Sequence, residues 1–197
     1  MTFFRDFFML SLSAIVAQNI FFTRALGSSR MLLLMRNTRS AVKYGMVLTW
    51  VTTAGSALSF LVWRLLSEHL TGVYMRPILF LACIYALFGL TYLVVKKQMP
   101  GLFQALAELA PSAFFSCAAL GTLLINSYQG HTLAKSLGFG LGSGIGFTLA
   151  LLIVELGLRR IALSDVPKAF RGLPIALLYV GLISLAIYGL TGHQLPS

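Results

Sequence analysis

The sequence predicts an all-α integral membrane protein with six transmembrane helices. Three observations support this: the chain of 197 residues is 58% hydrophobic and only 10% charged, six apolar runs fill most of it, and the charges lie almost wholly between those runs. About 20 apolar residues are needed to cross the hydrocarbon core of a bilayer. Because backbone polar groups cannot stay unpaired in lipid, runs of this length are expected to be helices.

The expected spans follow each other with short connections, in the order Phe7–Thr23, Tyr44–Trp63, Pro77–Val95, Leu109–Ala134, Ser136–Val154 and Gly172–Gly192. No basic segment or small-residue cleavage site marks the start as a signal peptide, so the first run is expected to remain as a span. Pro111 and Gly121 are expected to interrupt the fourth. The connections are too short for a second domain, which predicts a single membrane domain over residues 1–197.

The basic residues predict how the helices are oriented. Eleven of the fifteen lie in or beside the first, third and fifth loops: Arg24, Arg30, Arg36, Arg39, Lys43, Lys96, Lys97, Arg159, Arg160, Lys168 and Arg171. The net charge of +10 is therefore explained by topology and not by nucleic acid binding. By the positive-inside rule these loops face the cytoplasm, and both termini are extracytoplasmic.

The sequence contains no complete active site. Cys83 and Cys117 lie within expected spans, and the histidines at 69, 131 and 193 lie far apart near the outer surface, so a zinc site is not indicated. Neither a phosphate-binding glycine loop nor an H-E-x-x-H motif is present. No catalytic residue is therefore assigned.

An internal repeat divides the chain into residues 1–98 and 99–197. Phe21–Ser28 parallels Phe114–Thr122, and Arg76-Pro77-Ile78 parallels the Arg171–Ile175 segment. Three helices per unit reverse the orientation, so the units are predicted to be inverted repeats about an axis in the membrane plane. Interrupted segments at equivalent places in such repeats indicate a site near the midplane, although the same glycines would also serve as helix ends and close-packing surfaces.

Several motifs give the chain a family resemblance. They are Asn19 with Ala25-Leu26-Gly27, Tyr74-Met75-Arg76, Cys117–Gly121, Gly130-His131, Gly146-Phe147 and, above all, Asp165-Val166-Pro167-Lys168-Ala169-Phe170-Arg171-Gly172 with Ile175-Ala176-Leu177. With these motifs the chain resembles the A-type membrane subunit of the Rnf complex and its E-type Nqr relative, over essentially its whole length.

The resemblance implies an electron-transport subunit in the inner (plasma) membrane. Such subunits pair with a homologous six-helix subunit, E-type in Rnf and D-type in Nqr, and work beside subunits that carry flavin and iron–sulfur centres. Each of the pair supplies two cysteines to a shared 2Fe–2S iron–sulfur cluster. The complex relays electrons from ferredoxin or NADH and couples this to Na⁺ or H⁺ translocation. The small-residue run Gly138–Gly146 is expected to pack against that partner.

The chain departs from the family at one ligand position. The first cysteine of the family follows the Ala-Leu-Gly turn by two residues, where this chain has Ser29. Cys117 matches the second position, whereas Cys83 matches none and is interpreted as a small buried hydrophobe. Since a serine oxygen is a poorer cluster ligand than a thiolate, three interpretations follow: the cluster is absent, Ser29 and Cys117 hold it with an unusual ligand set, or the chain has another task.

Two other classes of function stay open at this point. An inverted-repeat transporter would bind its solute between the interrupted segments and needs no cluster, and a cofactor-less assembly subunit would only pack against redox partners.

Polar groups inside the spans are weaker candidates for functional residues. Glu108 suits either a cation or proton relay or an acid near a helix N-terminus. Glu155 and Arg159 suit an i,i+4 pair, and Asn19 and Asn126 suit hydrogen bonds between helices.

Overall fold

The computed structural model describes residues 2–28, 38–66, 74–98, 109–163, 167 and 170–191, and these form helices joined by turns, without a strand among them. The helices are α1 (Thr2–Ile15), α2 (Ile20–Arg24), α4 (Thr38–Leu66), α5 (Met75–Gln98), α7 (Ala110–Phe114), α8 (Cys117–Tyr128), α9 (Leu133–Ala162) and α10 (Leu173–Thr191). The predicted all-α class is therefore confirmed for the described residues.

Five stretches of the described chain are long and apolar enough to cross a membrane: α4, α5, α7 with α8, α9 and α10. This finding supports a multi-pass membrane protein. The first predicted span differs, because the chain there is divided into the 14 residues of α1 and the five of α2. The division lies at Asn19, whose side chain accepts hydrogen bonds from the amides of Phe21 and Phe22 and so starts a new helix.

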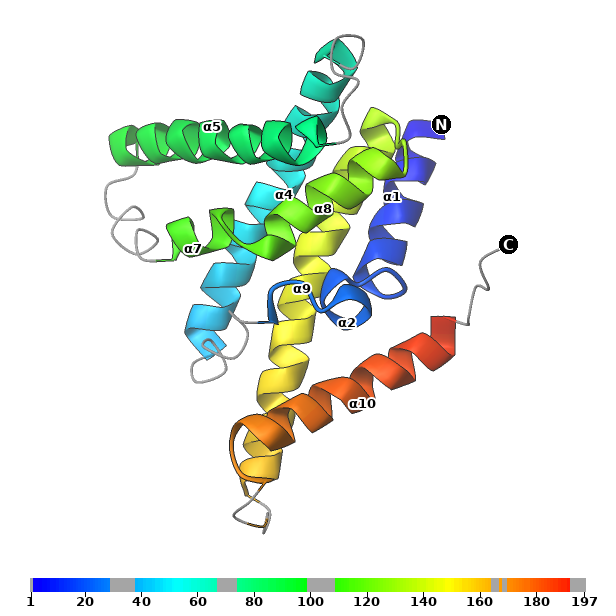
Figure 1. Cartoon of the computed structure of the whole chain (residues 1–197), viewed down its shortest axis with the longest axis vertical. Coiled ribbons are helices and arrows are strands. Elements are labelled where there is room, and N and C mark those ends of the chain that lie inside the picture. The colour runs from blue at the N-terminus through cyan, green and yellow to red at the C-terminus, as the bar shows by residue number, and fades with distance from the viewer. Residues whose placement is uncertain are drawn as a thin grey trace.

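Helices α4 and α9 cross at the centre of the molecule, and α1 lies against α9 (Figure 1). Glycine on α9 makes these close approaches possible. A Cβ atom on Gly142 would lie 2.4 Å from the Ser11 carbonyl oxygen of α1, and one on Gly144 would lie 2.4 Å from the Thr49 Cα of α4. The expectation that a partner subunit fills this glycine surface is therefore wrong, since α1 and α4 of the same chain occupy it.

Helices α5 and α10 lie at the periphery, on opposite sides of the α4–α9 pair (Figure 1). Only 22% of the α5 span and 6% of the α10 span are buried, compared with 61% for α9. Both helices are nevertheless strongly apolar, with mean hydropathies of 2.5 and 2.1. They therefore present most of their apolar surface outward.

Candidate functional site

The first helix break is organised by one buried amide. Asn19 is 4% exposed and caps α2 with its side-chain oxygen. Its Nδ2 donates to the carbonyl oxygens of Ile15 at 3.0 Å and Gly146 at 2.9 Å. The side chain thus joins the end of α1, the start of α2 and the middle of α9, which confirms the prediction that Asn19 bridges helices.

The turn after α2 is tightly constrained. Ala25 ends the helix in the left-handed conformation with φ of 54°, and Gly27 follows with φ of +82°. Such angles favour glycine because a Cβ atom is crowded there. At Gly27 a Cβ atom would also lie 2.5 Å from the Phe147 ring and 3.3 Å from the Ala118 Cβ. The turn is therefore pressed against α8 and α9.

The second break separates α7 from α8 at Phe115 and Ser116. Ser116 caps α8, since its Oγ accepts the Ala119 amide at 3.1 Å and donates to the Ala113 carbonyl at 2.9 Å. Gly121, predicted as an interruption of this run, lies inside α8 instead. Its role is packing, because a Cβ atom there would lie 2.5 Å from the Leu26 Cδ1 of the first turn.

The two breaks meet at Cys117, the first residue of α8. The Gly27 amide donates to the Cys117 Sγ at 3.1 Å, although the two residues are 90 positions apart. The thiol is otherwise exposed. Ser29 lies two residues beyond Gly27 and outside the described residues, so its approach to Cys117 remains a prediction.

A backbone amide and the start of a helix both direct positive dipoles toward the Cys117 sulfur. Within the described part of the chain no three His, Cys, Asp or Glu side chains gather as a metal site. Cys83 lies on α5 and is only 7% exposed. Of the two cysteines, Cys117 is therefore the exposed one, at the junction of the two helix breaks.

A polar triad lies where the start of α4 meets the last turns of α9. Glu155 is 1% exposed. Its Oε1 accepts hydrogen bonds from Thr38 and Arg159, each at 2.6 Å, and Arg159 also donates to the Thr38 hydroxyl at 2.8 Å. The i,i+4 pair is thereby confirmed, but sequence reasoning missed Thr38. Nothing in the sequence around a threonine at the start of a helix indicates that its hydroxyl will contact a residue 117 positions away.

A polar network ties the end of α8 to α9 and α4. Asn126 donates to the Ser136 hydroxyl, which donates to the Ser56 carbonyl at 3.0 Å. The Asn126 Oδ1 lies 2.9 Å from the His131 Nδ1. Because the Asn126 amide nitrogen already faces Ser136, this ring nitrogen of His131 is the donor. The prediction that Asn126 bridges helices is confirmed.

Glu108 and the segments 164–166 and 168–169, which hold half of the Asp165–Gly172 motif, lie outside the described residues.

Comparison with known proteins places this architecture in one family. The family model described as "Rnf-Nqr subunit, membrane protein" matches residues 7–194. The A-type subunit of the ion-translocating oxidoreductase complex of Cereibacter sphaeroides is 36% identical over 187 residues, which cover 95% of this chain and 97% of that protein. The A-type subunit of the Na⁺-translocating ferredoxin:NAD⁺ oxidoreductase complex of Acetobacterium woodii is 35% identical over 187 residues, covering 94% and 97%.

The A-type subunit of the ion-translocating oxidoreductase complex of Aliivibrio fischeri is 32% identical over 187 residues, again covering 95% of this chain and 97% of the relative. The family match extends over both helix breaks and all of the candidate membrane-crossing helices. The chain belongs to the Rnf-Nqr family of membrane subunits.

Proposed function

We propose that this chain is the A-type membrane subunit of an Rnf-type ion-translocating oxidoreductase complex. It takes part in electron relay between the ferredoxin or NADH side and the flavin-bearing subunits, coupled to Na⁺ or H⁺ movement, and has no active site of its own. The observation that carries this is the alignment with the A-type subunits of such complexes over 95% of the chain and 97% of the relative. A free-standing transporter is disfavoured because the relatives are complex subunits.

The contacts between helices support two inverted repeats. The α1–α2 unit packs on α9, and the α7–α8 unit packs on α4. Likewise α10 contacts α2 and α9, while α5 contacts α8 and α4. If α1–α2, α4 and α5 are exchanged for α7–α8, α9 and α10 in that order, each of these contacts becomes another of the set. A pseudo-twofold axis in the membrane plane would relate the contacts in the same way. In this proposal α1 with α2 forms the sixth crossing.

The partner we propose is the homologous E-type Rnf subunit, or D-type Nqr subunit. Support comes from the surface around Cys117, where the thiol is exposed on the single chain. The outward apolar faces of α5 and α10 offer further area for contacts within the membrane. Other subunits of the complex, bearing flavin and iron–sulfur centres, complete the assembly.

Cys117 is this chain's proposed ligand to an iron–sulfur cluster shared with that partner, and Ser29 occupies the position of the family's first cysteine ligand. Such a cluster, when bound, supplies a one-electron carrier within the membrane. The residues of this chain hold the thiol in place: Ser116 fixes the start of α8, and the Gly27 amide donates to the sulfur. Hydrogen bonds to ligating sulfur tune the reduction potential.

The test is the iron content and electron paramagnetic resonance spectrum of the assembled complex. Cys117→Ala should abolish or strongly reduce the intramembrane iron–sulfur signal, because it removes the thiol at the junction of the breaks. Cys83→Ala is the matched control and should leave the signal intact, since that thiol is buried on α5. Ser29→Cys should strengthen the signal.

An assembled complex whose iron signal is unchanged in Cys117→Ala would remove this residue from the electron path. Recovery of the chain only as a homo-oligomer, without flavin or iron–sulfur subunits, would contradict the proposed assembly.

A further inference from the structure

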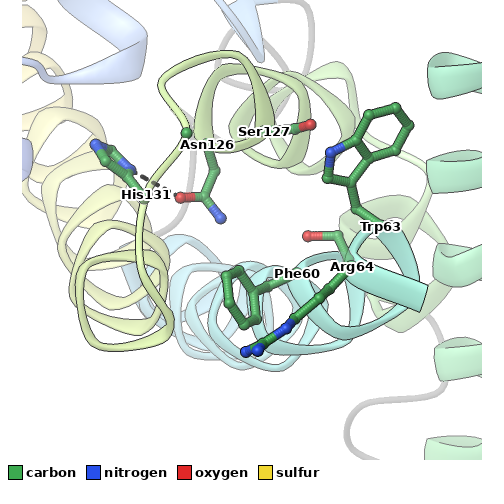
Figure 2. A pocket seen from close by; sticks show the side chains of 8 residues that line it. Phe60, Trp63, Arg64, Asn126, Ser127 and His131 are labelled. Atoms are coloured by element: carbon green, nitrogen blue, oxygen red, sulfur yellow. Dashed lines mark hydrogen bonds between the residues drawn. The ribbon is translucent and has the colours of Figure 1, made fainter. Parts of the chain in front are cut away.

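A cavity of about 300 Å³ opens between the end of α4 and the end of α8 (Figure 2). It is lined by Ser59, Phe60, Trp63, Arg64, Asn126, Ser127, Gly130 and His131. Figure 2 shows the α4 residues on one side of the opening and the α8 residues with His131 on the other. The cavity lies at the opposite end of α4 from the Thr38 triad, and neither helix break contributes to it.

Hydrogen-bond donors face this cavity. The Ser127 hydroxyl is buried and has no partner among the described residues. Figure 2 shows the indole nitrogen of Trp63 turned toward the opening, with the Ser127 hydroxyl directed toward Trp63. A buried donor without a partner is costly, so a ligand that accepts hydrogen bonds would stabilise this arrangement.

The charge around the cavity is positive. Arg64 lines it, and the Arg76 guanidinium stacks 4.2 Å from the Trp63 ring and 5.2 Å from the Tyr128 ring. Within the described chain, neither arginine pairs with a carboxylate. No Asp or Glu is among the lining residues. An anion is therefore the ligand that this charge distribution selects.

His131 adds no charge to the cavity at pH 7. Burial, and secondarily the neighbouring Lys135 ammonium, lower the pKa of His131 from its usual 6.5. The ring is therefore neutral at pH 7, and the full charge among the lining residues comes from Arg64.

The position of the cavity indicates where the anion comes from. The candidate span of α4 ends at Leu65, and that of α7 with α8 ends at Tyr128, so the opening lies at the membrane boundary. Leu61 and Leu65 flank Arg64 on α4 and are 51% and 67% exposed. A phospholipid matches this arrangement, with its phosphate at the level of Arg64 and its acyl chains along the two leucines. Trp63 beside Arg64 is also typical of a membrane boundary, where tryptophan is enriched.

We propose that this cavity is a binding site for the headgroup of an anionic phospholipid, with the phosphate at Arg64 and the other polar atoms of the headgroup at the Trp63 indole N–H and the Ser127 hydroxyl, which lie across the cavity from the Arg64 guanidinium (Figure 2). Arg76 fixes Trp63 by stacking and adds positive potential. This site is separate from the proposed electron-transfer function, and either can fail without the other.

The test uses the purified chain, delipidated and titrated with phosphatidylglycerol in detergent, with binding followed by native mass spectrometry. Arg64→Gln should weaken phosphatidylglycerol binding by about tenfold or more, because it removes a charge-assisted contact to phosphate. Ser127→Ala should weaken it about threefold, as expected for one neutral hydrogen bond. The matched control is Arg5→Gln, which removes the same charge at the same end of the molecule from a residue already beside Asp6.

Three outcomes would overturn the proposal. Equal weakening by Arg64→Gln and Arg5→Gln would mean that only general charge attracts the lipid. Equal binding of phosphatidylcholine and phosphatidylglycerol would exclude selection for an anionic headgroup. Displacement of phosphatidylglycerol by millimolar inorganic phosphate would assign the cavity to a soluble anion. Thermal unfolding of each variant, unchanged from the parent protein, would confirm that the variants are folded.

Discussion

His131 links the stability of the α8–α9 turn to pH. The ring donates to the Asn126 Oδ1 at 2.9 Å and packs 5.7 Å from the Phe139 ring. Because burial, and then Lys135, lower the pKa of this ring below 6.5 in the folded protein, the unfolded chain binds a proton more readily than the folded one in the range just below 6.5. Folded stability therefore falls as the pH drops through 6.5.

We expect the apparent Tm of the purified chain to be lower at about pH 5.5 than at about pH 7.5, with part of the difference due to His131. His131→Asn should reduce that difference, because asparagine does not titrate. Lys135→Gln should reduce it less, since Lys135 is the smaller cause of the lowered pKa. A variant His131→Asn with the same pH dependence as the parent would show that other groups cause it. Thermal unfolding across this pH range makes the measurement.

The candidate site could be predicted in part at the level of residues. The repeat motif placed the Ala25-Leu26-Gly27 turn as the mate of the Cys117 segment, and the Gly27 amide does contact Cys117. Thr38 and Ser136 could not be found in this way. Each hydroxyl acts through side-chain contacts between distant helices, and such contacts leave no periodic pattern in the sequence.

Helices α1 and α4 approach α9 closely at its glycine residues. At Gly142 a Cβ atom would meet the Ser11 carbonyl oxygen at 2.4 Å, and backbone atoms cannot move aside as a flexible side chain can. At Gly181 of α10 nothing lies within 4 Å of the corresponding position. The two glycines therefore form a matched pair for testing which helix contacts hold the molecule together.

Gly142→Ala should destabilise the purified chain by about 1–3 kcal/mol, the usual cost of overpacking a tight contact. Gly181→Ala should leave stability unchanged or slightly raised, because alanine favours a helix over glycine. Chemical or thermal unfolding in detergent would compare them. Equal destabilisation by both changes would contradict the assignment of α1 to the Gly142 face.

Hydropathy located the helices but not their interruptions. The apolar windows predict α4, α5, α9 and α10, with boundaries that the structure shifts by several residues. The first window concealed a break, because Asn19 ends one helix and caps the next without lowering the mean hydropathy. In the fourth window the sequence predicts interruptions at Pro111 and Gly121. Pro111 lies in the first turn of α7 instead, and the break follows Phe114, where Ser116 supplies the cap. Capping geometry thus decided the positions of both breaks.

At the scale of the whole molecule, the distribution of basic residues predicts the orientation. Reporter fusions after Arg39, Lys97 and Lys168 should show a cytoplasmic location, and a fusion after His193 should show an extracytoplasmic one. Alkaline phosphatase and green fluorescent protein fusions in parallel make the measurement. A cytoplasmic C-terminus would contradict the proposal of six crossings and of inverted repeats, since an odd number of crossings would follow.

The weak attachment of α10 has a consequence for the synthesis of the protein. With 6% of its span buried and a mean hydropathy of 2.1, α10 enters a bilayer because of its own composition and not because of helices already in place. The α4–α9 core is complete in sequence before α10 is translated. That core can therefore assemble while the last helix is still leaving the ribosome, and α10 docks without displacing anything. A chain cut short after α9 would still contain both central helices of the fold.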